Sequence, residues 1–151
     1  MATKTYRADE SHGRAVMGLI HRITAGGGER PTLELNVRHR LVLQALGLEG
    51  SRSIAAIGQQ LGLGPSTMTG LVDRLEGQGL VRRERHARDR RATVLRLTRK
   101  GEAAFRREVD FYRALLDGML EATDDDAKPL ILDAVAHLGR ARRTAAALAV
   151  A

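Results

Sequence analysis

The sequence predicts a mostly α-helical fold with a small β-wing, and three observations support this prediction. Two short amphipathic helical patterns lie on either side of the tight turn Gly62-Leu63-Gly64. An arginine-rich hairpin pattern follows the second of them. Further apolar helical patterns precede and follow this central part. The expected architecture is a winged helix-turn-helix with additional N- and C-terminal helices.

The first central helix is indicated by apolar residues at helical spacing, namely Ile54, Ile57 and Leu61. Ser51 or Ser53 can cap it, because a serine oxygen accepts a hydrogen bond from a free N–H group of the first turn. Gly58 is expected where the two central helices cross, since it has no side chain to keep them apart.

The second central helix is expected to use Gly64 as its N-cap and Pro65 as its first residue, and Gly79 can end it. Its buried stripe comprises Met68, Leu71, Val72 and Leu75. Its open face carries Ser66, Thr67, Thr69, Gly70, Asp73 and Arg74. The second helix of a helix-turn-helix can lie in the DNA major groove.

On that open face, Ser66, Thr67 and Thr69 can donate hydrogen bonds to bases or phosphates. Arg74 is expected either to reach the DNA backbone or to pair with Asp73 or another neighbour, and the sequence favours neither alternative.

The hairpin is predicted from a strand over residues 80–83 and a second strand over 92–97. In the second strand, Leu95 and Leu97 are expected to face inward and Val94 and Arg96 outward. The connecting residues 84–91 are almost all charged, so they are expected to form a solvated tip that can enter the adjoining minor groove. The alternative is a charged surface that serves only solubility.

Within this tip, Asp89 and Arg91 are two residues apart on one strand face and can form an ion pair. Such a pair would hold Arg91 extended toward the groove, and Arg88 and Arg90 are expected to contact phosphates.

Bulk properties point to one compact domain with a polyanionic partner. The chain has 151 residues and a formal net charge of +7, and its basic residues cluster at 82–100, which favours nucleic acid over a membrane or an acidic protein.

The sequence contains no cysteine, which excludes disulfides, thiolate metal sites and thiol-based peroxide sensing. The sequence also shows neither a signal-peptide pattern nor an apolar run of membrane-spanning length, so we expect a cytoplasmic protein without a membrane partner.

The flanking helices complete the chain. One is expected from Ser11, ended by the glycine-rich connector at 26–28, and another over 35–46 with inward residues Val37, Leu41, Val42 and Ala45. Thr98 is a predicted N-cap for a long helix through Glu121. The acidic residues 124–126 are expected to cap a final helix. These apolar stripes exceed what one small winged domain can cover, so the surplus predicts a partner surface. The alternative is that these helices only complete the core of a monomer.

The string GPSTMTGLVDRLEGQGLVRRE at 64–84, followed by Asp89-x-Arg91 and Leu97-Thr98-x-x-Gly101, resembles the MarR family of winged-helix transcription regulators. The resemblance implies a homodimer formed by residues 1–34 and 99–151, with 35–98 as the DNA-binding domain. It implies most often a repressor on a pseudo-palindromic operator, with the Asp-x-Arg pair supporting DNA binding. Gly70 departs from the family, many of whose members carry a longer polar or basic side chain there.

The family resemblance also implies a small, often aromatic, effector in a crevice between the dimer helices and the winged domain. His21 and His39 lie on the first two expected helices, so either could face it, although a surface or core histidine is the more common outcome. No metal-ligand spacing, cofactor motif or catalytic constellation appears in the sequence, so neither a metal, a cofactor nor an enzyme is expected. Two alternatives to a regulator remain, an effector-independent architectural DNA-binding protein and a ligand-sensing module that acts through a protein partner.

Overall fold

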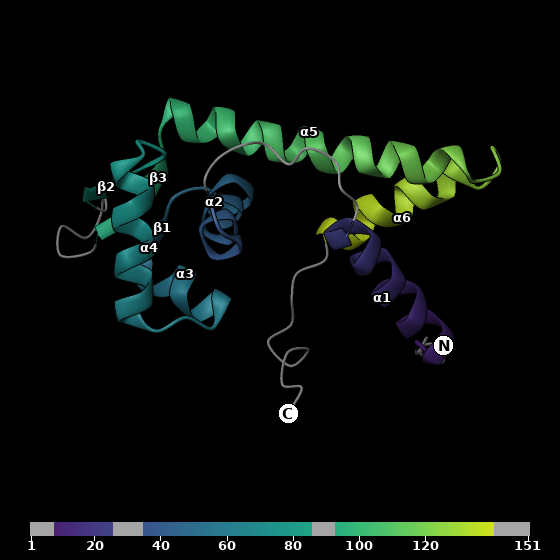
Figure 1. The fold of residues 1–151 in the computed structure, drawn as a ribbon, viewed down its shortest axis with the longest axis horizontal. Helices are drawn as coiled ribbons and strands as arrows, with labels where there is room; N and C mark the ends of the chain where they lie inside the picture. The colour runs from purple at the N-terminus through teal and green to yellow at the C-terminus, as the bar shows by residue number, and fades with distance from the viewer. Residues whose placement is uncertain (1–7, 26–34, 86–92, 141–151) are drawn as a thin grey trace, which may run out of the picture. The chain divides into compact units, whose positions relative to one another are not determined.

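The computed structural model describes residues 8–25, 35–85 and 93–140 (Figure 1). The described helices are α1 Glu10–Ala25, α2 Val37–Glu49, α3 Ile54–Leu61, α4 Pro65–Gly77, α5 Arg99–Glu121 and α6 Lys128–Arg140. The described strands are β1 Arg52–Ser53, β2 Val81–Arg85 and β3 Thr93–Leu97. The chain divides into two compact units, Met1–Tyr112 and Arg113–Ala151.

The helix-turn-helix formed by α3 and α4 confirms the predicted capping and turn residues. Ser53 is the N-cap of α3, and its Oγ accepts a hydrogen bond from the Ala56 N–H at 3.1 Å. The helix ends at Gly62, whose φ of 65° lies in the left-handed region that favours glycine. Gly64 then precedes Pro65 at the start of α4, as expected.

Gly58 permits the close approach of these two helices. A Cβ atom at this position would lie 3.0 Å from both the Leu63 carbonyl oxygen and Met68 Cγ. A larger residue would therefore push the turn and α4 away from α3. The prediction that Gly58 lies where the helices meet is confirmed.

The hydrophobic core of the first unit brings together α2, α3, α4, the sheet and the start of α5. Its most deeply buried large side chains are Leu43, Ile57, Met68, Leu75, Leu80 and Leu95. All four residues of the predicted α4 stripe belong to this core. The buried stripe fixes which side of α4 remains open to solvent.

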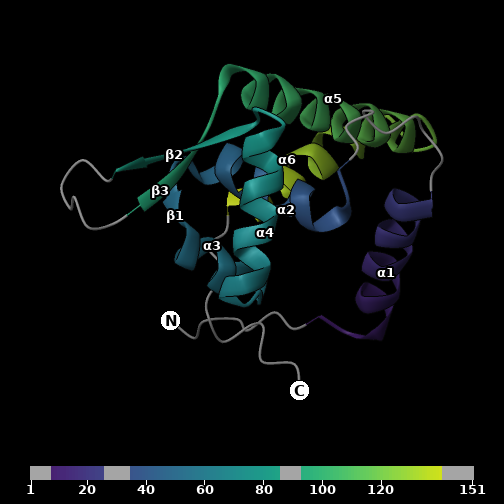
Figure 2. The ribbon, with the colours of Figure 1, turned by 60° about the vertical axis from the view of Figure 1, so that its left-hand side comes forward.

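The sheet has the strand order β1-β3-β2 and is antiparallel throughout (Figure 2). The sequence did not predict β1, which has only two residues. Its presence explains one error, because Val94 was expected to face outward and is buried at 8% exposure. Val94 lies on the central strand and is flanked by Ser53 and Glu84, so its backbone and side chain are covered from both sides.

The predicted inward face of α2 is confirmed for Val42 and Ala45 and wrong for Val37 and Leu41. The helix begins at Val37, with Asn36 as N-cap, and extends to Glu49 rather than ending at residue 46. Val37 and Leu41 are exposed, and the buried residues are His39, Val42, Leu43, Ala45 and Leu46. Apolar residues occur on more than one side of this helix, so periodicity alone could not identify the side that faces the core.

The start of α5 is joined closely to the end of the helix-turn-helix. Thr98 Oγ1 accepts a hydrogen bond from the Gly101 N–H at 3.1 Å, which confirms the predicted N-cap, and its hydroxyl donates to the Gly79 carbonyl at 2.5 Å. A Cβ atom at Gly101 would lie only 1.9 Å from the Leu80 carbonyl oxygen, so this contact requires glycine. Lys100 Nζ donates to the Gln78 carbonyl at 2.8 Å.

The second unit contains the end of α5 and helix α6. Helix α6 begins at Lys128, after the acidic residues 124–126, and Lys128 Nζ lies 2.5 Å from Asp125 Oδ1. The predicted continuation of this helix beyond Arg140 lies outside the described residues. Among the helices that the structure describes, none is long and apolar enough to cross a membrane.

Candidate nucleic-acid interface

The open face of α4 presents polar groups from a helix whose opposite face is anchored in the core. Ser66, Thr69, Gly70 and Arg74 are exposed, and Thr67 is half-buried. Because the buried stripe holds α4 in place, these residues are presented in a fixed order along one helix. A rigid helix with short polar side chains and one arginine suits the major groove, where hydroxyls and guanidinium groups reach base edges and phosphates.

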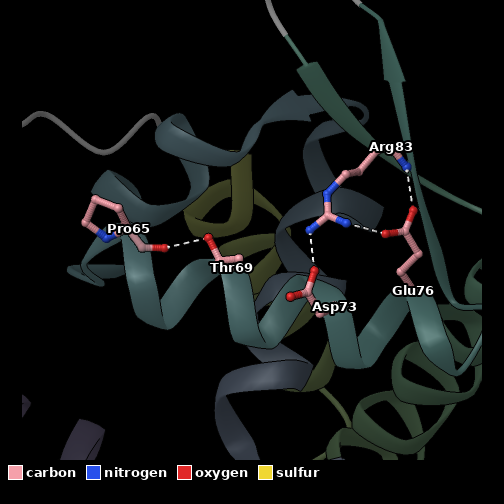
Figure 3. Close-up of polar contacts among 5 residues, drawn as sticks. All are labelled: Pro65, Thr69, Asp73, Glu76 and Arg83. Carbon is pink, nitrogen blue, oxygen red and sulfur yellow. Dashed lines mark hydrogen bonds and ion pairs between the residues drawn. The ribbon is translucent and has the colours of Figure 1, made fainter.

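Thr69 already uses its proton within the protein. Its Oγ1 donates to the Pro65 carbonyl oxygen at 3.0 Å (Figure 3). The oxygen remains able to accept a hydrogen bond, and the methyl group is available for apolar contact with thymine. Donation from Thr69 to DNA, as the sequence suggested, would require the bond to Pro65 to break.

Gly70 has open space around it. A Cβ atom added there would meet no heavy atom within 4 Å. Gly70→Ala is therefore expected to raise the free energy of unfolding by about 0.5–1 kcal/mol, because alanine loses less backbone entropy in a helix. Urea unfolding of the free protein measures this change. Gly79→Ala is the control and is expected to lower the free energy of unfolding, since the φ of 70° at Gly79 strains an alanine. Destabilisation by Gly70→Ala would contradict the open surroundings of Gly70.

The sequence left two alternatives for Arg74, a contact with the DNA backbone or an ion pair with Asp73 or another neighbour. The position of Asp73 helps to decide between them. Asp73 Oδ1 lies 2.6 Å from Nη2 of Arg83 on β2, rather than pairing with Arg74. Within the described residues Arg74 itself forms no ion pair. Its guanidinium group is therefore available for a phosphate.

Arg83 is the residue that the sequence analysis missed. Its guanidinium group also pairs with Glu76, one turn further along α4, so a single side chain links strand β2 to α4 (Figure 3). The sequence contained a partial signal, because Asp73 and Glu76 have the i, i+3 spacing that places them on one helix face. The register that brings Arg83 opposite them depends on the tertiary fold.

The other face of the hairpin carries a smaller charge cluster. Glu84 lies between two arginines, with its carboxylate 2.7 Å from Arg82 Nη2 and 3.4 Å from Arg96 Nε. The predicted contact residues of the tip, Arg88, Asp89, Arg90 and Arg91, lie outside the described residues. Their proposed pairing and DNA contacts stay predictions.

The two histidines suggested for an effector lie in different surroundings. His21 on α1 is exposed, whereas His39 on α2 is buried at 5% exposure, and its Nδ1 has no hydrogen-bond partner. Burial lowers the pKa of the His39 imidazole below its ordinary value of 6.5, and the nearby charge of Arg74 lowers it further.

This lowered pKa predicts a pH dependence of stability. The unfolded chain binds the His39 proton more readily than the folded chain, so the free energy of unfolding is expected to fall as the pH drops from about 6.5 through the lower, folded-state pKa. Urea unfolding across pH 5–8 would measure how the free energy of unfolding changes with pH. His39→Leu is expected to remove this part of the pH dependence, and His137→Ala, at an exposed histidine, is the control. Identical pH profiles for wild type and His39→Leu would contradict the assignment.

A cavity of about 500 Å³ lies in the first unit, where the end of α2 meets β3 and the start of α5. Its lining includes the apolar residues Leu46, Leu97 and Phe105 and the basic residues Arg96 and Arg106. Neither His21 nor His39 is among the lining residues. The structure therefore does not bring the two predicted effector residues to this cavity. Among the described residues, no group of three His, Cys, Asp or Glu side chains is placed to hold a metal ion.

A helix-turn-helix whose second helix presents an anchored polar face, next to an arginine-bearing hairpin, defines a DNA-binding protein of the winged-helix class. Comparison with known proteins agrees with this class. A family model described as MarR family matches residues 35–93. The HTH-type transcriptional regulator YfiV of Bacillus subtilis is 30% identical over 113 residues, which are 75% of this chain and 71% of the relative.

Two solved structures share the fold. Transcriptional regulator Tm0710 from Thermotoga maritima superposes with a TM-score of 0.69 at 25% identity, covering 86% of this chain and 93% of that chain. Streptococcus pneumoniae FabT, solved in complex with DNA, has a TM-score of 0.60 at 18% identity, covering 85% of this chain and 90% of FabT. The chain belongs to the MarR family of transcription regulators.

Proposed function

We propose that this protein is a sequence-specific DNA-binding transcription regulator that acts as a homodimeric repressor on a pseudo-palindromic operator. The observation that carries the proposal is the exposed polar face of α4, held by a buried stripe and flanked by the basic hairpin. Ser66, Thr67, Thr69, Gly70 and Arg74 face the major groove. The tip residues Arg88, Asp89, Arg90 and Arg91 serve the minor groove and the backbone.

Dimerisation is supported by large apolar side chains that remain exposed on the terminal helices. Those on α1 are Val16, Met17, Leu19 and Ile20, and those on α6 are Leu130, Leu132, Val135 and Leu138. Exposed apolar surface of this kind marks an interface, and a second copy of the chain is the partner we propose. Residues 1–34 and 99–151 form the dimer, and 35–98 bind DNA. Two-fold symmetry places the two α4 helices about 34 Å apart, one turn of DNA.

A small-molecule effector, often aromatic in this family, is a further part of the proposal. It releases DNA only if it binds one dimer shape more tightly than the other. The chain has no cysteine, so an effector must act by binding rather than by thiol oxidation. His21 and His39 stay the predicted contacts for it. As a regulator, the protein acts in the cytoplasm and has no enzymatic role.

The test is binding of the purified protein to the DNA that flanks its own gene, against random competitor DNA and across a salt series. Nanomolar binding that outlasts the competitor is expected for a specific regulator. Binding that the competitor removes equally from every sequence, including those from a random-sequence selection, would favour an architectural protein instead. Weak binding that survives loss of the tip arginines would favour a ligand-sensing module that acts through a protein partner.

A further inference from the structure

We propose that Arg83 is a positioning residue, which holds the hairpin against α4 and so makes specific DNA recognition depend on a contact that does not touch DNA. The Arg83 clamp consists of Arg83, Asp73 and Glu76. This inference rests on the proposed function, because it concerns how the DNA-binding surface is assembled. It assigns to two acidic residues of α4 a role in favour of DNA binding.

The geometry joins strand and helix at three points. Arg83 Nη2 lies 2.6 Å from Asp73 Oδ1, and Arg83 Nη1 pairs with Glu76 Oε2. In addition, the main-chain N–H of Arg83 donates to Glu76 Oε1 at 3.2 Å. Glu76 therefore holds both the side chain and the backbone of the same strand residue (Figure 3).

The backbone contact matters because β2 is an edge strand. In the described sheet, β2 has β3 on one side only. An outward N–H on an edge strand has no sheet partner, and Glu76 supplies one for Arg83. The clamp thus fixes the edge of the hairpin to the helix that carries the base-reading residues.

The arrangement requires an arginine rather than any cation. Asp73 and Glu76 are three residues apart, so their carboxylates lie side by side on one helix face. The planar guanidinium group presents several N–H donors in a fixed fork and can bind both carboxylates at once. A lysine ammonium keeps the charge but lacks this geometry.

The direction in which DNA affinity changes when Glu76 is removed distinguishes a positioning role from a purely electrostatic one. Removing a carboxylate from a helix that approaches DNA normally strengthens binding, because it removes repulsion from phosphates. If Glu76 instead positions the hairpin, its loss must weaken binding to the operator. Glu76→Ala therefore separates a positioning role from simple charge.

The chain offers a matched control on the same strand. Arg82 precedes Arg83 and, because side chains alternate along a strand, points to the opposite face. It pairs with Glu84 of its own strand at 2.7 Å rather than with α4. Arg82→Lys and Arg83→Lys make the same chemical change one residue apart, and only the second alters the clamp.

The experiment compares full-length wild type, Arg83→Lys, Glu76→Ala and Arg82→Lys for binding to the operator and to random DNA. Arg83→Lys and Glu76→Ala are expected to weaken operator binding about five- to tenfold, with Arg82→Lys near wild type. The affinity of Arg83→Lys for random DNA should change little, because lysine keeps the positive charge. Operator binding by Glu76→Ala at or above the wild-type level would overturn the positioning role.

A second measurement needs no DNA. Hydrogen exchange at the Arg83 amide is expected to be faster in Glu76→Ala than in wild type, and unchanged in Arg82→Lys. Unaltered exchange in Glu76→Ala would overturn the clamp, whatever the DNA results. Wild-type protein that prefers no DNA sequence would instead overturn the proposed function, while the exchange rates would still decide whether the clamp holds the hairpin.

Discussion

Replacing Arg91 by alanine is expected to weaken operator binding about ten- to a hundredfold, while the dimer stays intact. The reason is that an arginine inserted into a narrow minor groove meets a strongly negative potential, and losing one specific groove contact costs about 1–3 kcal/mol. Titration of labelled operator DNA measures the affinity, and sedimentation equilibrium checks the dimer. Asp89 is the proposed ion-pair partner of Arg91, so loss of the Asp89 side chain should also weaken operator binding, by a smaller factor.

Arg90→Ala is the matched control for that experiment. Since Arg90 is expected to contact phosphate, its loss should weaken all sequences alike and reduce the salt slope by about one unit. An Arg91→Ala protein with unchanged operator affinity would refute the minor-groove contact. Equal losses on operator and random DNA would assign Arg91 to the phosphates as well.

Leu138→Asp is expected to raise the dissociation constant of the dimer about a hundredfold or more, and to remove operator binding at nanomolar protein. Leu138 is 72% exposed in the single chain, so it contributes little to the fold of one copy. In the proposed dimer it is buried, and the substitution would lose apolar burial and place a carboxylate in an apolar interface. Analytical ultracentrifugation across a concentration series measures the dissociation constant.

His137→Asp provides the control for Leu138→Asp, because it adds a carboxylate to the neighbouring exposed position of the same helix. It is expected to leave the dimer close to wild type. A Leu138→Asp protein that remained dimeric at nanomolar concentration would remove this face of α6 from the interface.

The helix-turn-helix was predictable because its signals are local. Ser53, Gly62 and Pro65 act on the residues next to them, and the structure places each where its own conformational preference required. The buried stripe of α4 was predictable for a related reason. The open face of this helix has few apolar residues, so the spacing of the apolar residues identified the buried face.

The remaining features depend on contacts between distant residues. The burial of Val94 follows from strand β1, which is too short to have a sequence pattern of its own. The inward face of α2 was misjudged because Val37 and Leu41 are as apolar as the residues that reach the core. The partnership of Asp73 with Arg83 depends on how the hairpin lies on α4. The DNA contacts of residues 88–91 stay predictions from sequence.

The contact between Gly101 and the Leu80 carbonyl makes the start of α5 a stiff joint rather than a hinge. With Thr98 and Lys100 bonded to the chain just after α4, the first turn of α5 cannot rotate without carrying α4 along. The part of α5 that belongs to the first unit extends from this joint to Tyr112. A force that turns this part of α5 would therefore reach α4 through the same joint.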